Sequence, residues 1–438
     1  MSSNNTGTML AARWHPPSYD IRVEKVPVPQ IEDPDDAVVK VTLAGLCGSD
    51  LHIYRGQQPI TKVHITGHEF IGEVVELGSN YGTNAARSTS GRPNLYATLS
   101  VGDKVVAPFT VSCGECHVCR LGYTGRCPVG ALFGSPKLDG GQAQYVRVPK
   151  AGGTLYNLSS PASWSSALTA TSDVETLLKN ISDSSLLLLS DILPTGVFAA
   201  TQLLAHPKMQ PMLTGRSWPL SLDLSSSTID LGSGLLTQED RLLTIAIIGL
   251  GPVGVCAAVA LLEALAQKGL PYRIAAIDIN QSRREKMKMV YEAIGPDGKG
   301  KKGEFVVQGL EEAKETVAKW TGGVGCTGVL EVVGNNSALT AAYDLARPFG
   351  VITSVGVHAP KNVPFTGQDL YNKNISFDFG RCPARAMFPM AFELLDVFGK
   401  VGTESSLIDR VVDIKQASEM YRAFDQGQVG KVLFDPWD

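Results

Sequence analysis

Hydrophobic and polar positions divide this chain into two patterns. The first third contains short β-branched runs separated by glycine, proline and aspartate, which are typical of the strands of a barrel-like domain. These runs cover residues 37–43, 71–77, 104–107 and 145–148. From residue 242 onward, apolar strands alternate with helical stretches. The strands are expected at 244–248, 273–279, 328–333 and 351–355, and the helices at 252–267 and 282–294. Strands that alternate with helices predict a parallel, doubly wound sheet.

Polar stretches interrupt both patterns. Residues 79–100 are rich in Asn, Thr and Ser and are interpreted as an inserted surface loop, and residues 207–239 as a second insertion. Residues 296–303 carry a run of lysines typical of a solvated turn. A chain of 438 residues is too long for one ordinary core, so two domains or one large composite domain are expected.

Composition narrows the class of protein. The chain is 44% hydrophobic and 19% charged, which favours a folded globular protein over a disordered one. Its net charge of −4 gives no reason to expect a nucleic-acid partner. Residues 1–10 lack the features of a secretory signal, and the longest apolar runs are too short to span a bilayer. We therefore expect a cytoplasmic protein with no membrane association.

Four closely spaced cysteines form the pattern C-x2-C-x2-C-x7-C within residues 110–130: Cys113, Cys116, Cys119 and Cys127. Four thiolates can complete a tetrahedral shell around one ion, and zinc is the usual occupant, although iron–sulfur clusters also use four cysteines. A closed shell leaves no open coordination position, so the pattern predicts a structural metal. His117 lies inside the loop but is not needed as a ligand.

A second candidate metal centre involves the segments GLCGSDLH (45–52) and GHE (67–69). Cys47 and His68 could bind zinc with one further ligand, which would leave a fourth position for substrate. Taken alone, a Cys and a His at this separation are more often ordinary core residues. Asp191 precedes a helix expected near residue 194, so from the residues alone it is equally a helix cap.

A glycine-rich turn follows the strand at 244–248. Gly249, Gly251 and Gly254 form G-x-G-x-x-G, with Pro252 and Val253 between the last two glycines. A strand before this motif and a helix after it is the context that dinucleotide binding requires.

An acidic residue follows at the expected distance. Asp278 ends the next strand, where a carboxylate binds ribose hydroxyls and favours NAD, while nearby Arg283 leaves NADP possible. Asp278 could instead cap the following helix, as could Asn280 or Ser282.

The later strands end in further candidate cofactor contacts. These are Gly334, Gly356 and Val357, with Thr195 added from the start of the second domain. His358 is interpreted as a loop residue. Cys256, Cys326 and Cys382 are given no role.

The motifs in their order resemble the zinc-containing medium-chain alcohol dehydrogenases. GLCGSDLH, TGHEFIGEVVELGS, VGDKVVAPF, the four-cysteine loop and DGGQAQYVRVP lead into LLLSDILPTGVFAA and GRCPARAMFP. The resemblance is strongest to the fungal zinc-type enzymes and to the bacterial formaldehyde and secondary-alcohol dehydrogenases, whose branch uses an Asp ligand.

The resemblance implies a role for each residue of the second metal centre. Cys47, His68 and Asp191 would bind a catalytic zinc, and Glu69 would neighbour it. Asp50 would orient His68. Ser49 would take the alcohol proton, and His52 would pass it to solvent.

The implied architecture is a GroES-like β-barrel catalytic domain (1–192) completed by residues 377–438, with a Rossmann domain (193–376) between them. The implied activity is hydride transfer between NAD(P) and an alcohol, aldehyde or ketone, in a homodimer or homotetramer. A zinc-independent quinone or enoyl reductase and a non-enzymatic dinucleotide-binding relative are less consistent with the full set of ligands. Formaldehyde dehydrogenase or dismutase activity stays open, and the substrate is not identified.

Overall fold

The chain forms two compact units in the computed structural model. The structure describes residues 7–82, 91–161, 164, 174–222, 236–294, 303–358, 362–395 and 407–438. One unit comprises Met1–Pro194 with Pro383–Asp438, and the other comprises Thr195–Cys382. The boundary between Cys382 and Pro383 lies after β14 (Ser376–Phe379). This strand pairs with β13 (Ala346–Ser354) and therefore belongs to the sheet of the second unit.

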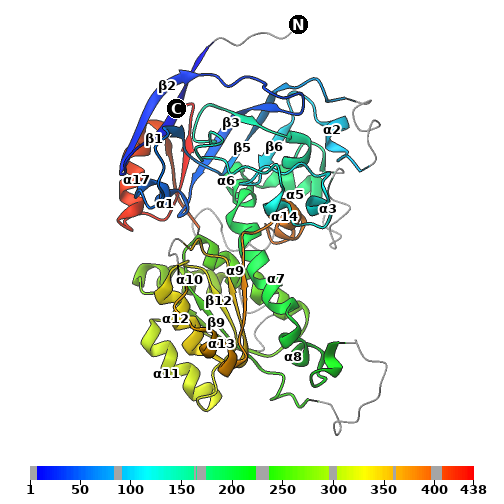
Figure 1. The fold of residues 1–438 in the computed structure, drawn as a ribbon, viewed down its shortest axis with the longest axis vertical. Coiled ribbons are helices and arrows are strands. Elements are labelled where there is room, and N and C mark those ends of the chain that lie inside the picture. The colour runs from blue at the N-terminus through cyan, green and yellow to red at the C-terminus, as the bar shows by residue number, and fades with distance from the viewer. Residues whose placement is uncertain are drawn as a thin grey trace. The chain divides into compact units, whose positions relative to one another are not determined.

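The first unit is built on β-sheets, as expected (Figure 1). The four strands predicted in this unit are confirmed as β3 (Ala37–Leu46), β5 (Phe70–Leu77), β6 (Lys104–Ala107) and β7 (Tyr145–Val148). The larger sheet has the order β15-β16-β3-β5-β6-β8, with β7 also paired to β3, and a smaller sheet has the order β2-β1-β4. The other strands are β1 (Thr8–His15), β2 (Asp20–Pro27), β4 (His64–Ile65), β8 (Tyr156–Asn157), β15 (Ile408–Asp413) and β16 (Lys431–Asp435).

Short helices complete the first unit. They are α1 (Asp50–Tyr54), α2 (Leu95–Thr98), α3 (His117–Arg120), α4 (Ala151–Thr154), α5 (Val174–Asn180), α6 (Asp183–Leu187), α14 (Ala384–Glu393) and α17 (Ala417–Asp425), with 3-10 turns η2 (Thr124–Arg126), η5 (Leu188–Ser190) and η8 (Ile414–Gln416). A core of Val39, Val41, Phe70, Val105 and Phe133 packs between the strands.

The interpretation of residues 79–100 as a surface loop is wrong for the part near α2. Tyr96 is fully buried, and the guanidinium of Arg92 lies 3.7 Å from the centre of its ring. Arg92 also forms an ion pair with buried Asp35. Leu95 and Leu99 are buried in the core as well, so the polar composition concealed a few apolar side chains that are enough to hold the segment against the core. Residues 83–90 lie outside the described residues.

The second unit is a six-stranded parallel sheet with the order β11-β10-β9-β12-β13-β14 (Figure 1). Counted along this unit, the order is the 3-2-1-4-5-6 of a dinucleotide-binding doubly wound fold, which confirms the predicted class. The strands not yet given are β9 (Leu243–Ile248), β10 (Tyr272–Ile277), β11 (Gly303–Gln308) and β12 (Cys326–Glu331). Every residue of β9 is buried, as expected for the centre of a parallel sheet.

Helices connect these strands. They are α9 (Pro252–Gln267), α10 (Gln281–Ala293), α11 (Leu310–Thr321), α12 (Asn336–Leu345) and α13 (Gly367–Lys373), and α7 (Ile192–Ala205) leads into the unit. The helix predicted at 252–267 is confirmed with the same limits.

The described part of the segment 207–239 forms short helical turns, namely η6 (Pro207–Met209), α8 (Gln210–Thr214) and η7 (Leu220–Leu222). Residues 223–235 and 296–302, which carry the rest of that insertion and most of the lysine-rich turn, lie outside the described residues.

Among the residues that the structure describes, no single helix has the length and apolar composition needed to cross a membrane. Two consecutive helical segments, Asp183–Ser190 and Ile192–Ala205, together have that length and composition, but the chain bends by 50° between them.

Candidate metal centres and dinucleotide site

The candidate catalytic residues converge in the first unit. Cys47 follows β3, His68 and Glu69 precede β5, and Asp191 lies between η5 and α7. The ligand atoms of these four buried residues lie within 4.8 Å of one another. Nε2 of His68 is 3.2 Å from Oδ2 of Asp191, and Sγ of Cys47 is 3.6 Å from the same oxygen.

These separations suit a tetrahedral zinc site. Typical bond lengths of about 2.0 Å to nitrogen and oxygen and about 2.3 Å to sulfur give tetrahedron edges of roughly 3.3 Å (N to O) and 3.5 Å (S to O). Burial, and then the carboxylates of Glu69 and Asp191, raise the pKa of the Cys47 thiol. A divalent cation would reverse that effect, because it stabilises the thiolate and neutralises the neighbouring carboxylates. The donor set therefore fits zinc.

Asp50 links two of the candidate ligands. Its Oδ1 lies 3.0 Å from Nδ1 of His68, and its Oδ2 accepts a hydrogen bond of 3.0 Å from the backbone amide of Cys47. Asp50 is buried at the start of α1. A carboxylate on one ring nitrogen directs the other nitrogen of His68 toward Cys47 and Asp191, as in many metal sites.

Glu69 is paired with a lysine that the sequence analysis missed. Lys431, the first residue of β16, forms an ion pair with Oε2 of Glu69, and both side chains are only 1% exposed. The other oxygen, Oε1, is buried without a hydrogen-bond partner among the described residues. Burial raises the pKa of Glu69, and the charge of Lys431 opposes that rise. The one signal in the sequence was a lysine that opens an otherwise apolar strand, KVLFD.

Of the two proposed relay residues, Ser49 lies beside this centre and His52 lies further along the same segment, on α1. Oγ of Ser49 is 3.6 Å from Sγ of Cys47. Nδ1 of His52, on α1, lies 2.7 Å from Oε1 of Gln57, a partner that the sequence did not indicate. This hydrogen bond fixes the orientation of the His52 ring.

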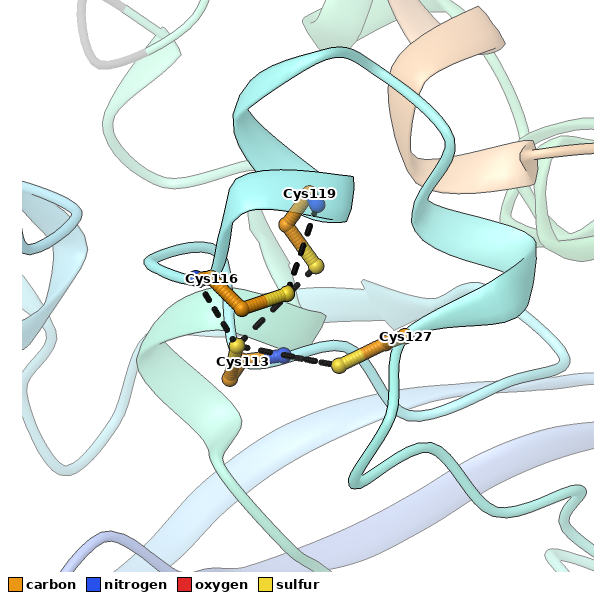
Figure 2. A group of neighbouring side chains, drawn as sticks. All are labelled: Cys113, Cys116, Cys119 and Cys127. Atoms are coloured by element: carbon orange, nitrogen blue, oxygen red, sulfur yellow. Dashed lines mark hydrogen bonds between the residues drawn. The ribbon is translucent and has the colours of Figure 1, made fainter.

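The four cysteines form a second cluster around α3 and η2, and their side chains point toward one another (Figure 2). Sγ of Cys113 lies 3.6 Å from that of Cys127 and 4.0 Å from that of Cys119. Zinc–sulfur bonds of about 2.3 Å give a tetrahedron edge of roughly 3.8 Å. A hydrogen bond from the Cys119 amide lowers the pKa of Cys116 to about 7. The set fits a closed zinc shell, and His117 is exposed beside it.

The glycine turn of the second unit has the expected form. Gly249 has φ +96°, which favours glycine, and Gly251 precedes α9, whose first residue is Pro252. A side chain at Gly254 would place its Cβ 1.9 Å from the carbonyl oxygen of Gly249. The turn therefore leaves the first amides of α9, including that of Val253, free of side chains that would block an anion.

Asp278 lies beside this turn and does not cap α10. Its Oδ2 accepts a hydrogen bond of 2.7 Å from the Leu250 amide, and Nη1 of Arg283 is 3.7 Å from the same oxygen. The cap of α10 is Asn280, whose side chain accepts from the amides of Ser282 and Arg283. The capping alternative for Asp278 is therefore not what the structure shows.

Three of the remaining cofactor candidates follow the carboxyl ends of β12 and β13, and the fourth, Thr195, lies in α7. Gly334 has φ +84°, and a Cβ at Gly356 would lie 2.3 Å from the amide of Gly334. Val357 is exposed beside them. Thr195 is buried in α7, and the next residue, Gly196, packs against Cys256 and Ala257 of α9.

A buried carboxylate that the sequence analysis missed holds these loops. Oε1 of Glu331 accepts hydrogen bonds from the amides of Val333 (2.9 Å) and Gly334 (2.8 Å). Oε2 accepts from Ser354 at 2.6 Å and lies 3.2 Å from Nε2 of His358. His358, interpreted from the sequence as a loop residue, is thus bound to the ends of two strands.

Comparison with known proteins agrees with this arrangement. Residues 33–159 match the model of the alcohol dehydrogenase GroES-like domain, and residues 252–396 match that of zinc-binding dehydrogenases. The chain is 35% identical to zinc-type alcohol dehydrogenase B of Aspergillus flavus over 99% of its own length and 82% of that protein. The chain belongs to the zinc-type alcohol dehydrogenases.

Two further similarities extend this result. The chain is 27% identical to a formaldehyde dismutase of Pseudomonas putida over 95% of each chain. The solved structure of alcohol dehydrogenase TADH from Thermus sp. ATN1 matches with a TM-score of 0.70 and 26% identity, covering 98% of this chain and 99% of that one.

Family membership confirms the enzyme class. As a zinc-type alcohol dehydrogenase, the protein is an NAD(P)-dependent oxidoreductase whose substrate is a small-molecule alcohol or carbonyl compound. This result favours the prediction of an alcohol dehydrogenase over the predictions of a zinc-independent reductase or a non-enzymatic relative.

Proposed function

We propose that this zinc-type alcohol dehydrogenase moves a hydride between NAD and an alcohol, aldehyde or ketone at a centre formed by Cys47, His68 and Asp191. The convergence of these three residues, with Asp50 bonded to two of them, carries the proposal. When bound there, zinc supplies a Lewis acid that polarises the substrate oxygen. The four cysteines at 113–127 would hold a second, structural zinc.

Side chains around the centre would carry the substrate proton to solvent. Oγ of Ser49 lies 3.6 Å from Sγ of Cys47, and Ser49 would accept the proton of a substrate hydroxyl. His52, fixed by Gln57, would pass that proton toward solvent. Glu69, held by Lys431, supplies a carboxylate beside the three ligands and would exchange with solvent at the metal.

The dinucleotide would bind at the glycine turn of the second unit. Its pyrophosphate would meet the backbone amides of Gly251, Val253 and Gly254 at the start of α9, while Pro252, which has no N–H, would only contact it. Asp278 would bind the ribose hydroxyls and favour NAD, with Arg283 allowing some NADP. Gly334, Gly356, Val357 and Thr195 complete the proposed cofactor contacts. We further propose a cytoplasmic homodimer or homotetramer.

A panel of alcohols and carbonyl compounds, followed by absorbance of the reduced nicotinamide, tests this function. We expect turnover that is lost after chelation and restored by zinc. Cys47→Ser should be inactive with any substrate in the panel. Zinc-independent turnover, or full activity of Cys47→Ser, would refute the proposed centre.

Formaldehyde dismutation is a second candidate, favoured by the similarity to the Pseudomonas putida dismutase along nearly the whole chain. A dismutase converts formaldehyde to methanol and formate without added NAD. Detection of both products without added NAD would support this reaction, and formaldehyde consumption that requires added NAD would exclude it.

A further inference from the structure

A buried hydrogen-bond network joins the two chain segments that carry Cys47 and His68. Its centre is the side-chain amide of Gln142, which has no solvent exposure. Nε2 of Gln142 donates to the carbonyl of Gly45 at 2.9 Å, and Oε1 accepts from the hydroxyl of Thr66 at 2.6 Å. Gly45 stands two residues before Cys47, and Thr66 stands two residues before His68. One amide therefore bridges the approaches to both candidate ligands.

The backbone fixes Gln142 in place. Its own amide donates to the carbonyl of Thr66 at 3.0 Å, and the amide of Gly141 donates to the carbonyl of Gly67 at 2.9 Å. Gly67 has φ +90°, and a Cβ at that position would lie 2.4 Å from Cγ of Gln142. Only glycine accommodates both this conformation and this contact, so the segment before His68 packs directly on the glutamine.

A tyrosine from the C-terminal part of the chain completes the network. The hydroxyl of Tyr421, on α17, donates to Oε1 of Gln142 at 2.8 Å. Tyr421 is fully buried, and burial raises the pKa of its hydroxyl well above the ordinary value. The hydroxyl therefore stays protonated and remains a donor. With it, the Gln142 carbonyl accepts two hydrogen bonds, which fixes the orientation of the amide.

We propose that Gln142, oriented by Tyr421, is a positioning residue that sets the separation of Cys47 and His68 in the catalytic metal centre. The proposal rests on the zinc centre of the proposed function. Asp50 bridges the same two residues through the backbone amide of Cys47 and Nδ1 of His68, and Gln142 bridges the segments that lead to them. Without the amide, the carbonyl of Gly45 and the hydroxyl of Tyr421 each lose a buried hydrogen bond. The hydroxyl of Thr66 keeps only the carbonyl of Ala12 at 3.1 Å, so the segments must shift to compensate.

The test compares Gln142→Met with Asn157→Leu. Asn157 is also a buried amide of the first unit, but its side chain bonds to Asp103 and to the amides of Ser159 and Ser160. The measurements are the release rate of each zinc into excess chelator and the absorption bands of the Co²⁺-substituted protein. Loss of a hydrogen bond made directly to a metal ligand weakens metal binding by about 10- to 100-fold. Gln142 bonds to residues two positions from the ligands, so we expect release of one zinc to be faster by up to about 10-fold in Gln142→Met, with altered cobalt bands, and unchanged metal release in Asn157→Leu.

Each result decides the proposal. If Gln142→Met lowers Tm as Asn157→Leu does but keeps wild-type zinc release and cobalt bands, Gln142 is only a structural residue and the inference is wrong. If the wild-type protein binds only the structural zinc, the proposed centre fails and the inference fails with it. Should Gln142→Met not fold, Tyr421→Phe, which removes one hydrogen bond, takes its place. A few-fold faster zinc release supports the proposal, and wild-type release overturns it.

Discussion

The carboxylate of Asp278 accepts a hydrogen bond of 2.7 Å from the backbone amide of Leu250, inside the glycine turn. Its other oxygen accepts from the amide of Asn280 at 2.8 Å. The Asp278 side chain therefore places a negative charge at the end of the strand. It also stabilises, through a hydrogen bond, the turn that is proposed to bind the pyrophosphate. Substitution of Asp278 should reveal both effects.

Asp278→Ala should shift the ratio of kcat/KM for NAD and NADP toward NADP, because it removes a charge that repels a 2′-phosphate. It should also raise KM for both cofactors, since the Leu250 amide loses its partner. Arg283→Ala is the control: Arg283 is half exposed, and its loss should weaken NADP use alone. A wild-type preference for NADP, or an unchanged ratio in Asp278→Ala, would refute the specificity role.

Substituting a cysteine of the candidate catalytic centre should affect the protein differently from substituting one of the four clustered cysteines. Wild-type protein should contain about two zinc ions per chain. Cys47→Ala should lose one and stay folded, whereas Cys116→Ser should lower the yield of folded protein, because structural zinc contributes directly to folding free energy. Metal analysis and circular dichroism measure these results. An unchanged zinc count in Cys47→Ala would remove Cys47 from the ligand set.

Substitutions of Asp191 test whether this residue is a zinc ligand or a helix cap. If it binds zinc, Asp191→Asn should release about one zinc and abolish turnover, because a neutral amide replaces an anionic oxygen. If it only caps α7, Asn should substitute well, and Asp191→Ala should cost about 0.5–2 kcal/mol of stability with zinc retained. NAD binding, measured by calorimetry, should be intact in both variants. Two zinc ions and full turnover in Asp191→Asn would place the third ligand elsewhere, with Glu69 the next candidate.

The buried pair of Lys431 and Glu69 predicts a large stability effect. Lys431→Met leaves a carboxylate buried without its counter-charge, which typically costs about 3–5 kcal/mol. The loss should be largest in chelated protein, since a bound cation would partly replace the lysine charge. The control is Lys104→Met, which breaks a partly exposed pair with Asp183 and should cost about 0–1 kcal/mol. Denaturant unfolding measures both, and equal losses in the two variants would contradict the argument.

Glu331 predicts a pH dependence of stability. Burial raises its pKa, but hydrogen bonds from His358, Ser354 and two backbone amides outweigh burial, so the pKa lies below the ordinary value of 4.5. A carboxyl whose pKa is lower in the folded state stabilises the fold fully above the unfolded pKa. That contribution is lost as the pH falls through the folded pKa.

Glu331→Gln should therefore be less stable than wild type at pH 7 and should lose less stability on acidification below about 4.5. Exposed Glu311, replaced by Gln, serves as the control. Denaturant unfolding from pH 7 to pH 3 measures the three curves. Parallel curves for wild type and Glu331→Gln would show that this carboxylate is not linked to folding.

Features whose parts are close along the chain could be predicted from the amino-acid sequence alone. Four cysteines within fifteen positions can enclose one ion whatever surrounds them, because the short loop between them limits their separation. The glycine turn likewise needs only a strand before it and a helix after it. The alternation of strands and helices was enough for the doubly wound sheet, and the structure confirms it.

Which distant groups meet depends on the tertiary structure. Asp191 stands 144 residues from Cys47, and only the fold shows that their side chains lie 3.6 Å apart. Lys431 reaches Glu69 because β16 pairs with β3, with Val432 opposite Leu46. Gln142 and Tyr421 are 279 residues apart. Such contacts depend on strand register and helix packing, which are set by the whole hydrophobic core, so a local pattern carries no signal of which polar group will be buried against which.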